Sequence, residues 1–241
     1  MGFLCSFAEA PIGRLRHHAN ELRERHCHDD PFVAVVLSGG YQEAGDEGRW
    51  NVRPGDVLIH HAFESHLDRF DHRGAEVLVL PVPHALSQSR TMRGRVADPD
   101  LLVRLAERDL GEAQASLAGQ FASCTAAPLD WPDALAADLR AMRDIPLGQW
   151  AEQAGVRQET LSRGFRLAYG CTPKAYRANA CARAAVSALR GTDTPFAAVA
   201  QQLGYADQAH MTRAVTMLTG LTPGGWRRRS NGFNTGAGAA P

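Results

Sequence analysis

The sequence predicts an α+β multidomain protein, in which an N-terminal antiparallel β-barrel is followed by an all-α C-terminal domain with two helix-turn-helix units. Three observations lead to this fold class. Residues 12–82 consist of short β-branched and apolar runs that end at Gly, Asp and Pro turns. Residues 146–229 contain one helical pattern twice. The formal net charge is +0, yet residues 147–241 hold 11 Lys and Arg against 4 Asp and Glu, so the C-terminal part is basic.

Several runs in the N-terminal part are predicted to be strands. They are rich in Val, Ile and Leu, and turn residues separate them at spacings of about 8 to 12 residues, which is typical of an antiparallel sandwich or barrel. The clearest are FVAVVLSGG, GRWNV, DVLIH and AEVLVLPV, at residues 32–40, 48–52, 56–60 and 75–82.

Histidines accompany these strands in a distinctive order. The run RHCHDD precedes a strand, SGGY follows it, and RPGDVLIHHAFESH comes next. This order resembles the cupin barrel, whose first motif carries His-x-His and whose second carries Pro-Gly-Asp followed by a His. The resemblance implies that residues 1–90 form a cupin-like barrel that senses an effector.

His26 and His28 are expected to point into the barrel and Cys27 away from it, because positions i and i+2 of a strand share a face. With His66 they make a set of three imidazoles, which can hold a divalent metal such as Zn, Fe, Mn or Ni. Val33 stands where the cupin motif has its glutamate ligand. The alternative is that the three histidines line a pocket for an organic effector or solvate the barrel mouth, and no cofactor is then required.

Two further histidines and a cysteine lie near this set in the sequence. His60 and His61 are adjacent, and adjacent strand residues face opposite sides, so at most one of them can join it. Cys27, flanked by imidazoles, is either a redox or electrophile sensor or an ordinary outward-facing thiol. The five cysteines are odd in number and have no paired spacing, so we expect no disulfide framework.

Residues 91–145 predict two or three amphipathic helices, with Asp98-Pro99 and Trp131-Pro132 as helix starts. These helices form a dimerisation surface, a relay between the barrel and the C-terminal domain, or a linker that packs against its neighbours. A single apolar stripe does not decide between these roles. The stripe consists of Leu101, Leu102, Leu105, Leu110, Leu117, Phe121, Leu135, Leu139 and Met142.

The repeated helical pattern occurs in two copies. The first copy consists of PLGQWAEQAGV followed by RQETLSRGFRLAYGCTP, and the second consists of PFAAVAQQLGY followed by ADQAHMTRAVTMLTGLTP. Each copy has an Ala-rich helix, a Gly turn, a second helix and a closing Gly-x-Thr-Pro. The segments TLSRGFRLAYGCTPKAY and GYADQAHMTRAVTMLTGLTPGGWR resemble the paired helix-turn-helix domain of AraC-type transcription regulators. A cupin-like barrel, helices and this domain are also the common layout of that family. The resemblance implies that residues 146–229 are a tandem DNA-binding domain.

The second helix of each copy is the expected recognition helix, because its N-terminal side chains can reach base edges in the major groove. Leu161 and Phe165, like Met211 and Val215, have the i, i+4 spacing of core residues. The alternative for each exposed arginine is a solvated helix face. The candidates for contact with bases or phosphates are Gln158, Glu159, Ser162, Arg163, Arg166, Lys174, Arg177, Gln208, Ala209, His210, Thr212 and Arg213.

The Ala-rich residues 173–190 link the two copies and begin with Pro at a first-turn position. As one helix they would span about 27 Å, comparable to the roughly 34 Å between successive major-groove faces. One chain can therefore read two neighbouring turns of DNA. The AraC pattern usually has an Arg-Leu pair in this helix, where this chain has Cys181-Ala182, with Arg183 two places on.

We therefore predict a cytoplasmic, non-catalytic, sequence-specific transcription regulator that responds to a small-molecule or metal signal. The expected partners are double-stranded promoter DNA, a small-molecule effector, a second copy in a homodimer, and RNA polymerase if the protein is an activator. No membrane partner is expected, because no apolar run approaches the roughly 18 residues of a membrane span. Two alternatives stay open: a metal-dependent cupin enzyme (a dioxygenase or isomerase) with an appended DNA-binding domain, and a dimerising interaction module that has lost specific DNA binding. Residues 230–241 are expected to be a disordered tail.

Overall fold

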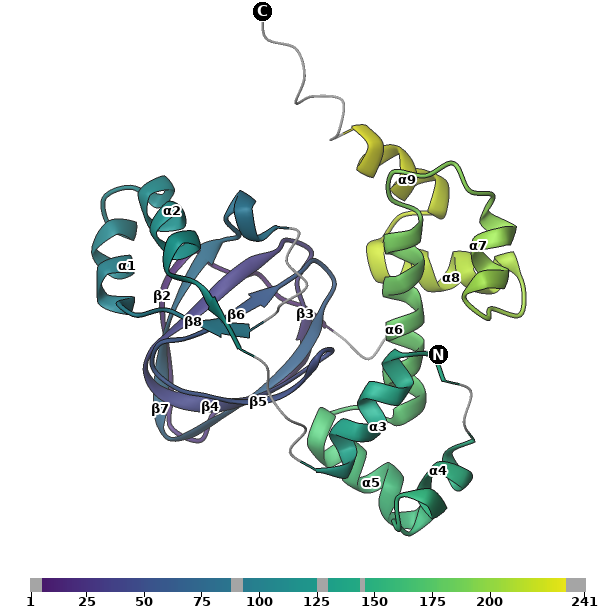
Figure 1. Cartoon of the computed structure of the whole chain (residues 1–241). Coiled ribbons are helices and arrows are strands. Elements are labelled where there is room, and N and C mark those ends of the chain that lie inside the picture. Colours follow the sequence, from purple (N-terminus) through teal and green to yellow (C-terminus); the bar gives the residue numbers. More distant parts are fainter. Residues whose placement is uncertain (1–5, 88–92, 125–129, 144–145, 233–241) are drawn as a thin grey trace, which may run out of the picture.

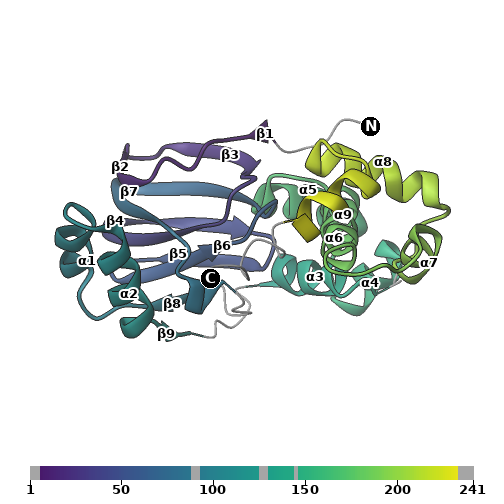
Figure 2. The same ribbon diagram turned by 90° about the horizontal axis from the view of Figure 1, so that it is seen from above.

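The structure is a computed structural model that describes residues 6–87, 93–124, 130–143 and 146–232. The N-terminal residues form a sheet, which lies beside a helical half formed by the C-terminal residues (Figures 1 and 2). The predicted fold class is confirmed: an antiparallel β region precedes an all-α region with two helix-turn-helix units. None of the helices in the described ranges is both long and apolar enough to cross a membrane.

The strands in the described ranges belong to one sheet. Its hydrogen-bonded order is β1-β3-β7-β4-β6-β8-β9, with β2 paired to β7 and β5 paired to β4. The β1 and β3 strands pair in parallel, and the other pairs are antiparallel. The bounds are β1 (Ser6–Phe7), β2 (Gly13–His17), β3 (Leu22–Cys27), β4 (Phe32–Gly45), β5 (Gly48–Val52), β6 (Asp56–His60), β7 (Ser65–Pro81), β8 (Arg93–Arg95) and β9 (Ala122–Ser123).

The two longest strands, β4 and β7, pair with each other and bend together. The pairing register shifts between Val36 and Ser38 and again between Gly39 and Tyr41. Gly39 has a φ of 70°, and a Cβ atom built there would lie 1.9 Å from the carbonyl oxygen of Gly74. The bend therefore requires glycine at this position. The predicted strand at 75–82 is only the second part of β7.

The sheet curves strongly (Figure 1), but it is not a closed barrel. Its pairing ends at β1 on one side and at β9 on the other, and no pair within the described ranges joins these ends. Both end strands have only two residues, which is too short for an extended ladder between them. Where the sequence predicts a barrel, the described residues thus form a curved sheet that is open at its edges.

Helices α1 (Pro99–Ala106) and α2 (Leu110–Gln120) pack on the sheet at the end away from the other helices (Figure 2). Leu102 and Leu117 are buried in one cluster with Val33 and Leu80 of the sheet. Asp98 caps α1 by accepting a hydrogen bond from the backbone N–H of Leu101, in agreement with the predicted helix start. Leu102 and Leu117 of the apolar stripe therefore pack within the chain, whereas Leu110 is exposed. A short 3-10 turn, η1 (His84–Leu86), follows β7.

The remaining helices form the C-terminal half. Helix α3 (Trp131–Arg140) precedes the first unit, which consists of α4 (Leu147–Gln153) and α5 (Gln158–Tyr169). The linker helix α6 (Pro173–Ala188) leads to the second unit, which consists of α7 (Phe196–Gln202) and α8 (Gln208–Thr219). Helix α9 (Pro223–Gly232) continues past the predicted domain end at 229, and residues 233–241 of the expected tail lie outside the described residues.

Each helix-turn-helix unit has a core that also includes residues of the sheet. The core of the first unit contains Phe165 together with Ala44 and Leu67, from β4 and β7. The core of the second unit contains Met211 together with Phe63, from the turn between β6 and β7. The sheet thus contacts both units at separate places.

Candidate nucleic-acid interface and imidazole cluster

The candidate DNA-reading surface is the exposed face of α5 and α8, the second helices of the two units. Leu161 and Phe165 of α5 are buried, as are Met211 and Val215 of α8, so the predicted core spacing is confirmed. The opposite face of each helix is open to solvent. It carries exposed Gln158, Glu159, Ser162, Arg163, Gln208, Ala209, His210 and Arg213, and half-buried Thr212.

The candidates for phosphate contact differ in exposure. Arg166, near the end of α5, and Lys174, at the start of α6, are exposed, whereas Arg177 is half-buried. The guanidinium of Arg227 lies 4.3 Å from the ring centroid of Phe196, so this arginine stabilises the second unit by a cation–π contact. Arg166 and Lys174 are therefore the better placed of these residues for sequence-independent contacts.

The N-terminal ends of the two recognition helices are fixed in different ways. Asp207 caps α8, because its carboxylate accepts a hydrogen bond from the backbone N–H of His210 at 2.6 Å. Arg157 stands at the same place before α5 and makes no side-chain cap. A cap of this kind contributes about 1 kcal/mol to helix stability. The end of α8 that would enter a groove is therefore held more firmly than that of α5.

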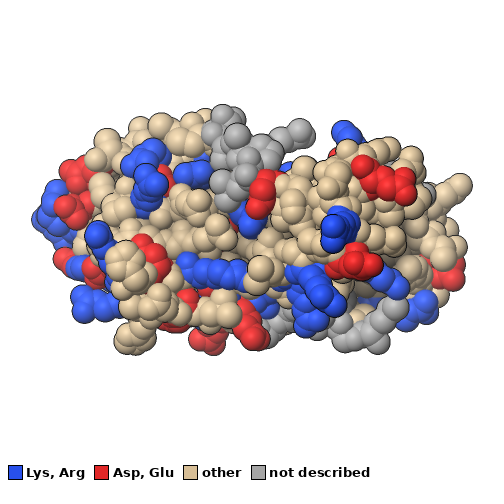
Figure 3. Space-filling model, turned by 90° about the horizontal axis from the view of Figure 1, so that it is seen from below, with Lys and Arg blue, Asp and Glu red and all other residues tan. Residues whose placement is uncertain are grey.

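The surface charge is mixed rather than gathered in one field. On the face seen in Figure 3, Lys and Arg side chains are spread over both halves of the molecule and are interspersed with Asp and Glu. On this face, the excess of basic residues in the C-terminal part therefore does not form a continuous positively charged patch.

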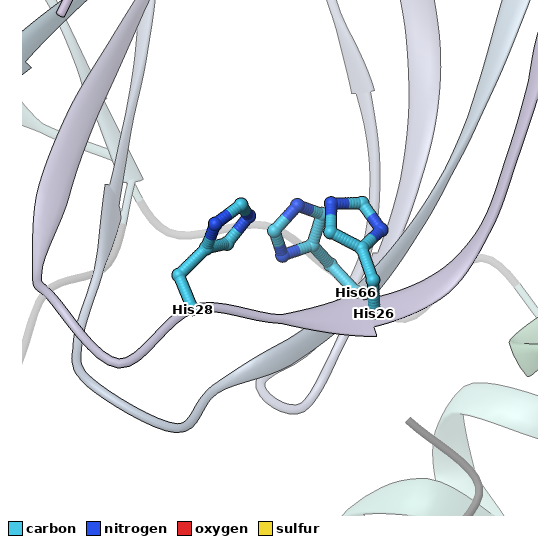
Figure 4. A group of neighbouring side chains, drawn as sticks. All are labelled: His26, His28 and His66. Carbon is cyan, nitrogen blue, oxygen red and sulfur yellow. The ribbon is translucent and has the colours of Figure 1, made fainter. Parts of the chain in front are cut away.

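The second candidate site is a cluster of imidazoles inside the sheet. His26, His28 and His66 are all buried, and one ring nitrogen of each lies within 4.8 Å of the others. Figure 4 shows the three rings directed into the same space between the strands. The pairing of His26 with His66 across β3 and β7 brings the two motifs together. The structure thus unites the three histidines that the sequence analysis selected.

Two of these imidazoles are oriented by backbone carbonyl groups. Nδ1 of His26 donates to the carbonyl of Glu24 at 2.9 Å, and Nδ1 of His28 donates to the carbonyl of Ala8 at 2.7 Å. A carbonyl can only accept, so Nδ1 carries the proton and Nε2 presents a lone pair. Nδ1 of His66 is buried without a hydrogen-bond partner. Such second-shell bonds and an unsatisfied buried nitrogen are the features of a metal-ligand set, so the residues present fit a divalent ion.

Burial keeps these imidazoles neutral. It lowers the pKa of His26 to about 4, and it also lowers the pKa of His28 and of His66, in His66 to well below the usual value. Protonation would place positive charges beside one another in a space of low polarity. At neutral pH the nitrogen lone pairs are therefore available to a metal ion or to a hydrogen-bond donor of a ligand.

The sequence pattern did not predict that buried acidic residues lie next to the cluster. Nε2 of His60 lies 3.5 Å from a carboxyl oxygen of Glu43, and Nε2 of His66 lies 3.7 Å from a carboxyl oxygen of Asp68. Burial raises the pKa of Asp68 to about 7 and the pKa of Glu43 well above its usual value, while it lowers the pKa of His60 to about 3. With neutral imidazoles these contacts are not ion pairs. Carboxyl groups therefore do lie near the cluster, although Val33 stands where the cupin motif has its glutamate ligand.

The thiol of Cys27, expected to face outward, is buried and not solvent-exposed, because the residue is only 1% exposed. Arg25, two residues earlier in β3, contacts the carbonyl of Tyr169 and the ring of Tyr176 in the helical half. Helices therefore cover β3 at Arg25. The sequence gives no local sign of such a covering.

Asp46, in the turn between β4 and β5, joins the sheet to the linker helix. Its buried carboxylate accepts hydrogen bonds from Arg25 of β3 and from Arg183 of α6. Its backbone carbonyl accepts a hydrogen bond from the hydroxyl of Tyr176 at 2.6 Å. Although burial favours the neutral acid, Arg183 and Arg25 hold the pKa of Asp46 below its usual range. One carboxylate thus pairs with two arginines from opposite sides of the boundary.

The same boundary includes the strand that carries His66. Nδ2 of Asn179, on α6, donates to Oγ of Ser65 at 2.8 Å, and Nη2 of Arg183 lies 3.4 Å from Oε1 of Glu64. Burial raises the pKa of Glu64 to about 7. The linker helix therefore contacts the two residues that directly precede an imidazole of the cluster. None of these contacts was predicted.

Comparisons with known proteins identify the C-terminal part. Residues 150–229 match a family described as "Helix-turn-helix domain". The match spans both units, from α4 into α9, and includes all the candidate DNA-contacting residues. The resemblance to AraC-type regulators is thereby confirmed for this part of the chain. No match was found among curated proteins.

Three solved structures illustrate what the chain is similar to. ToxT from Vibrio cholerae is 9% identical, with a TM-score of 0.41, over 91% of this chain and 97% of that chain. The C-terminal domain of AraT, a response regulator from Geobacillus stearothermophilus, is 22% identical, with a TM-score of 0.38, over 41% of this chain and 84% of that chain. The C-terminal domain of the response regulator yesN from Fusobacterium nucleatum is 18% identical, with a TM-score of 0.34, over 38% of this chain and 92% of that chain.

Proposed function

From the premise that residues 150–229 are a helix-turn-helix domain of the AraC type, we propose that this protein is a sequence-specific transcription regulator which binds promoter DNA through α5 and α8. The observation that carries the proposal is the pair of equivalent recognition helices, each with a buried stripe and an exposed arginine, Arg163 or Arg213. Helices of this kind place N-terminal side chains against base edges in the major groove. The test is a mobility shift with DNA selected by the protein, for which the decisive variants are argued in the Discussion.

The signal that this regulator senses is proposed to act at the imidazole cluster. His26, His28 and His66 are candidates for binding either a divalent metal ion or a small-molecule effector. The neutral rings of all three, and the oriented Nε2 lone pairs of His26 and His28, support this role. His26, His28 and His66 would hold such an ion, which would supply a positive charge inside the sheet. Binding of a ligand there would change the sheet and not the DNA-reading face itself.

Zinc binding provides a direct check of the metal form of this proposal. The full-length protein is expected to bind about one Zn²⁺ per chain, and His26→Ala combined with His28→Ala is expected to abolish this binding, because a zinc site needs at least three protein ligands. Isothermal titration calorimetry measures both. His18→Ala removes an exposed imidazole and serves as the matched control, which should bind like the wild type.

The pH dependence of zinc binding has a predicted sign. The pKa of each ligand imidazole lies below its usual value, so the rings are already unprotonated in the folded protein near neutral pH. In Asp68→Asn, which removes the neighbouring carboxyl group with a pKa of about 7, zinc affinity should therefore change little between pH 6 and pH 8 and fall only in more acid solution, where protons compete for Nε2. A steep tenfold loss of affinity per pH unit across the range from 8 to 6 would contradict the proposed ligands.

A further inference from the structure

Residues 61–64 form a turn between two imidazoles of the sheet. Strand β6 ends at His60, and β7 begins one residue before His66. The turn is closed by two hydrogen bonds between His61 and Glu64, of 3.1 Å and 2.9 Å. The backbone N–H of Phe63 also donates to the carbonyl of His28 at 2.7 Å. The turn is therefore hydrogen-bonded to His28 and leads directly into the strand that carries His66.

Phe63 has an unusual backbone conformation at the centre of this turn. Its φ is 65°, in the left-handed region that bulky side chains rarely adopt. Such a conformation costs free energy and persists only where the surroundings hold the residue in place. Here the surroundings are its hydrogen bond to His28 and the burial of its ring, which is 5% exposed.

The ring of Phe63 is buried in the second helix-turn-helix unit. It packs edge-to-face on the indole of Trp226, with 5.4 Å between the ring centroids, and belongs to the same cluster as Met211 and Val215 of α8. Nε1 of Trp226 donates to the carbonyl of Val186 in the linker helix at 3.0 Å. Phe63 thus contacts the residue that joins α9 to α6.

We propose that Phe63 is an intramolecular latch, which holds the second helix-turn-helix unit on the sheet and carries the signal of the imidazole cluster to it. A ligand that binds the three imidazoles acts on His28, which accepts the hydrogen bond of Phe63, and on His66, which follows the turn in β7. The backbone strain at Phe63 opposes the gain from burying its ring, so the docked position can respond to a small displacement. The inference rests on the proposed function, since it takes the second unit as a DNA-reading unit.

Hydrogen exchange of the full-length protein without DNA tests the docking. Phe63→Ala is expected to raise the exchange rates of backbone amides in α8 and α9 by about tenfold or more, because a buried aromatic contact is lost. Amides of α4 and α5 should keep their rates, since the first unit packs on Ala44 and Leu67 instead. Unchanged rates in α8 and α9 would overturn the latch.

A matched control separates loss of the latch from loss of sheet stability. Phe70→Ala removes an equally buried ring, 6% exposed, whose cluster lies within the sheet. It should leave the rates of α9 unchanged, and an equal rise in both variants would show that the effect is not specific to Phe63. Phe63→Gly removes the same ring and accepts a positive φ without strain, so it provides the test if Phe63→Ala does not fold.

Zinc alone then tests the passage of the signal. In the wild type, Zn²⁺ is expected to change the exchange of residues 61–65 and of α9. In Phe63→Ala it should change the exchange of residues 61–65 and leave α9 unaffected. Zinc that protects residues 26–28 of the wild type without any change in α9 would overturn the signalling role. If Zn²⁺ does not protect residues 26–28 at all, the metal signal proposed above is wrong, whereas the comparison of Phe63→Ala with Phe70→Ala still decides on the latch.

Discussion

Replacing Arg163 or Arg213 with alanine is expected to lower the affinity for the operator by about 5- to 150-fold, because a bidentate arginine contact to guanine contributes about 1–3 kcal/mol. Both side chains are exposed on the recognition helices, and each follows a buried residue of the core stripe by two positions. The substitutions remove no buried contact, so folding should be unaffected. Their effect should therefore report on DNA recognition alone.

The measurement is a mobility shift at fixed salt with an operator selected from random DNA by the wild-type protein. Arg166→Ala is the matched control, because this exposed arginine lies on the same helix at a position suited to phosphate. It should weaken binding to all sequences alike and reduce the slope of affinity against salt by about one charge. Sequence-specific binding that is unchanged in both Arg163→Ala and Arg213→Ala would remove α5 and α8 from the interface.

The elements of this DNA-binding domain were predictable because their signals are local. Pro173 stands at the first turn of α6, and Gly170 and Gly220 end α5 and α8 with φ values of 71° and 69°. The spacing of Leu161 and Phe165 identifies a buried stripe without reference to any other part of the chain. Local rules of this kind also gave β5 and β6 their observed bounds.

The surroundings of the imidazole cluster were only partly predictable. Alternation along one strand correctly separates His26 and His28 from Cys27, but it does not say what covers the other face of that strand. Glu43 reaches the cluster from β4, beyond two register shifts that lie between Val36 and Tyr41. Because each shift changes which residues face inward, counting along β4 from its start cannot place this carboxyl group.

The contacts between the two halves had no sequence signature. Arg183 was visible as an arginine displaced from the usual position in the linker helix, yet nothing identified its partner. The partner, Asp46, is 137 positions away along the chain and lies in a hairpin turn, where an aspartate is ordinarily explained by turn preference. Ion pairs between distant segments depend on how the segments pack, which only the folded structure shows.

Asp46→Ala is expected to lower the free energy of unfolding by about 3–5 kcal/mol, because it removes the buried carboxylate that the buried Arg25 shares with Arg183, which keeps only its longer contacts to Glu64 and Glu47. The carboxylate is 6% exposed and lies at the boundary of sheet and linker helix. Since its folded-state pKa is below the usual value of 3.8, its ionised form stabilises the protein above that pH. The difference from wild type should therefore be full at pH 7 and decrease as the pH falls through the folded-state pKa.

Urea denaturation at several pH values measures this loss. Asp130→Ala is the matched control, because Asp130 also pairs with an arginine, Arg49, but its side chain is 53% exposed. An exposed pair contributes only about 0–1 kcal/mol, so this variant should unfold nearly like the wild type. Asp46→Asn keeps the size of the side chain and loses its charge, which separates electrostatic from packing effects. If Asp46→Ala is no less stable than Asp130→Ala, the boundary between the halves is held by its apolar contacts, and Arg183 does not need its partner for the two halves to stay joined.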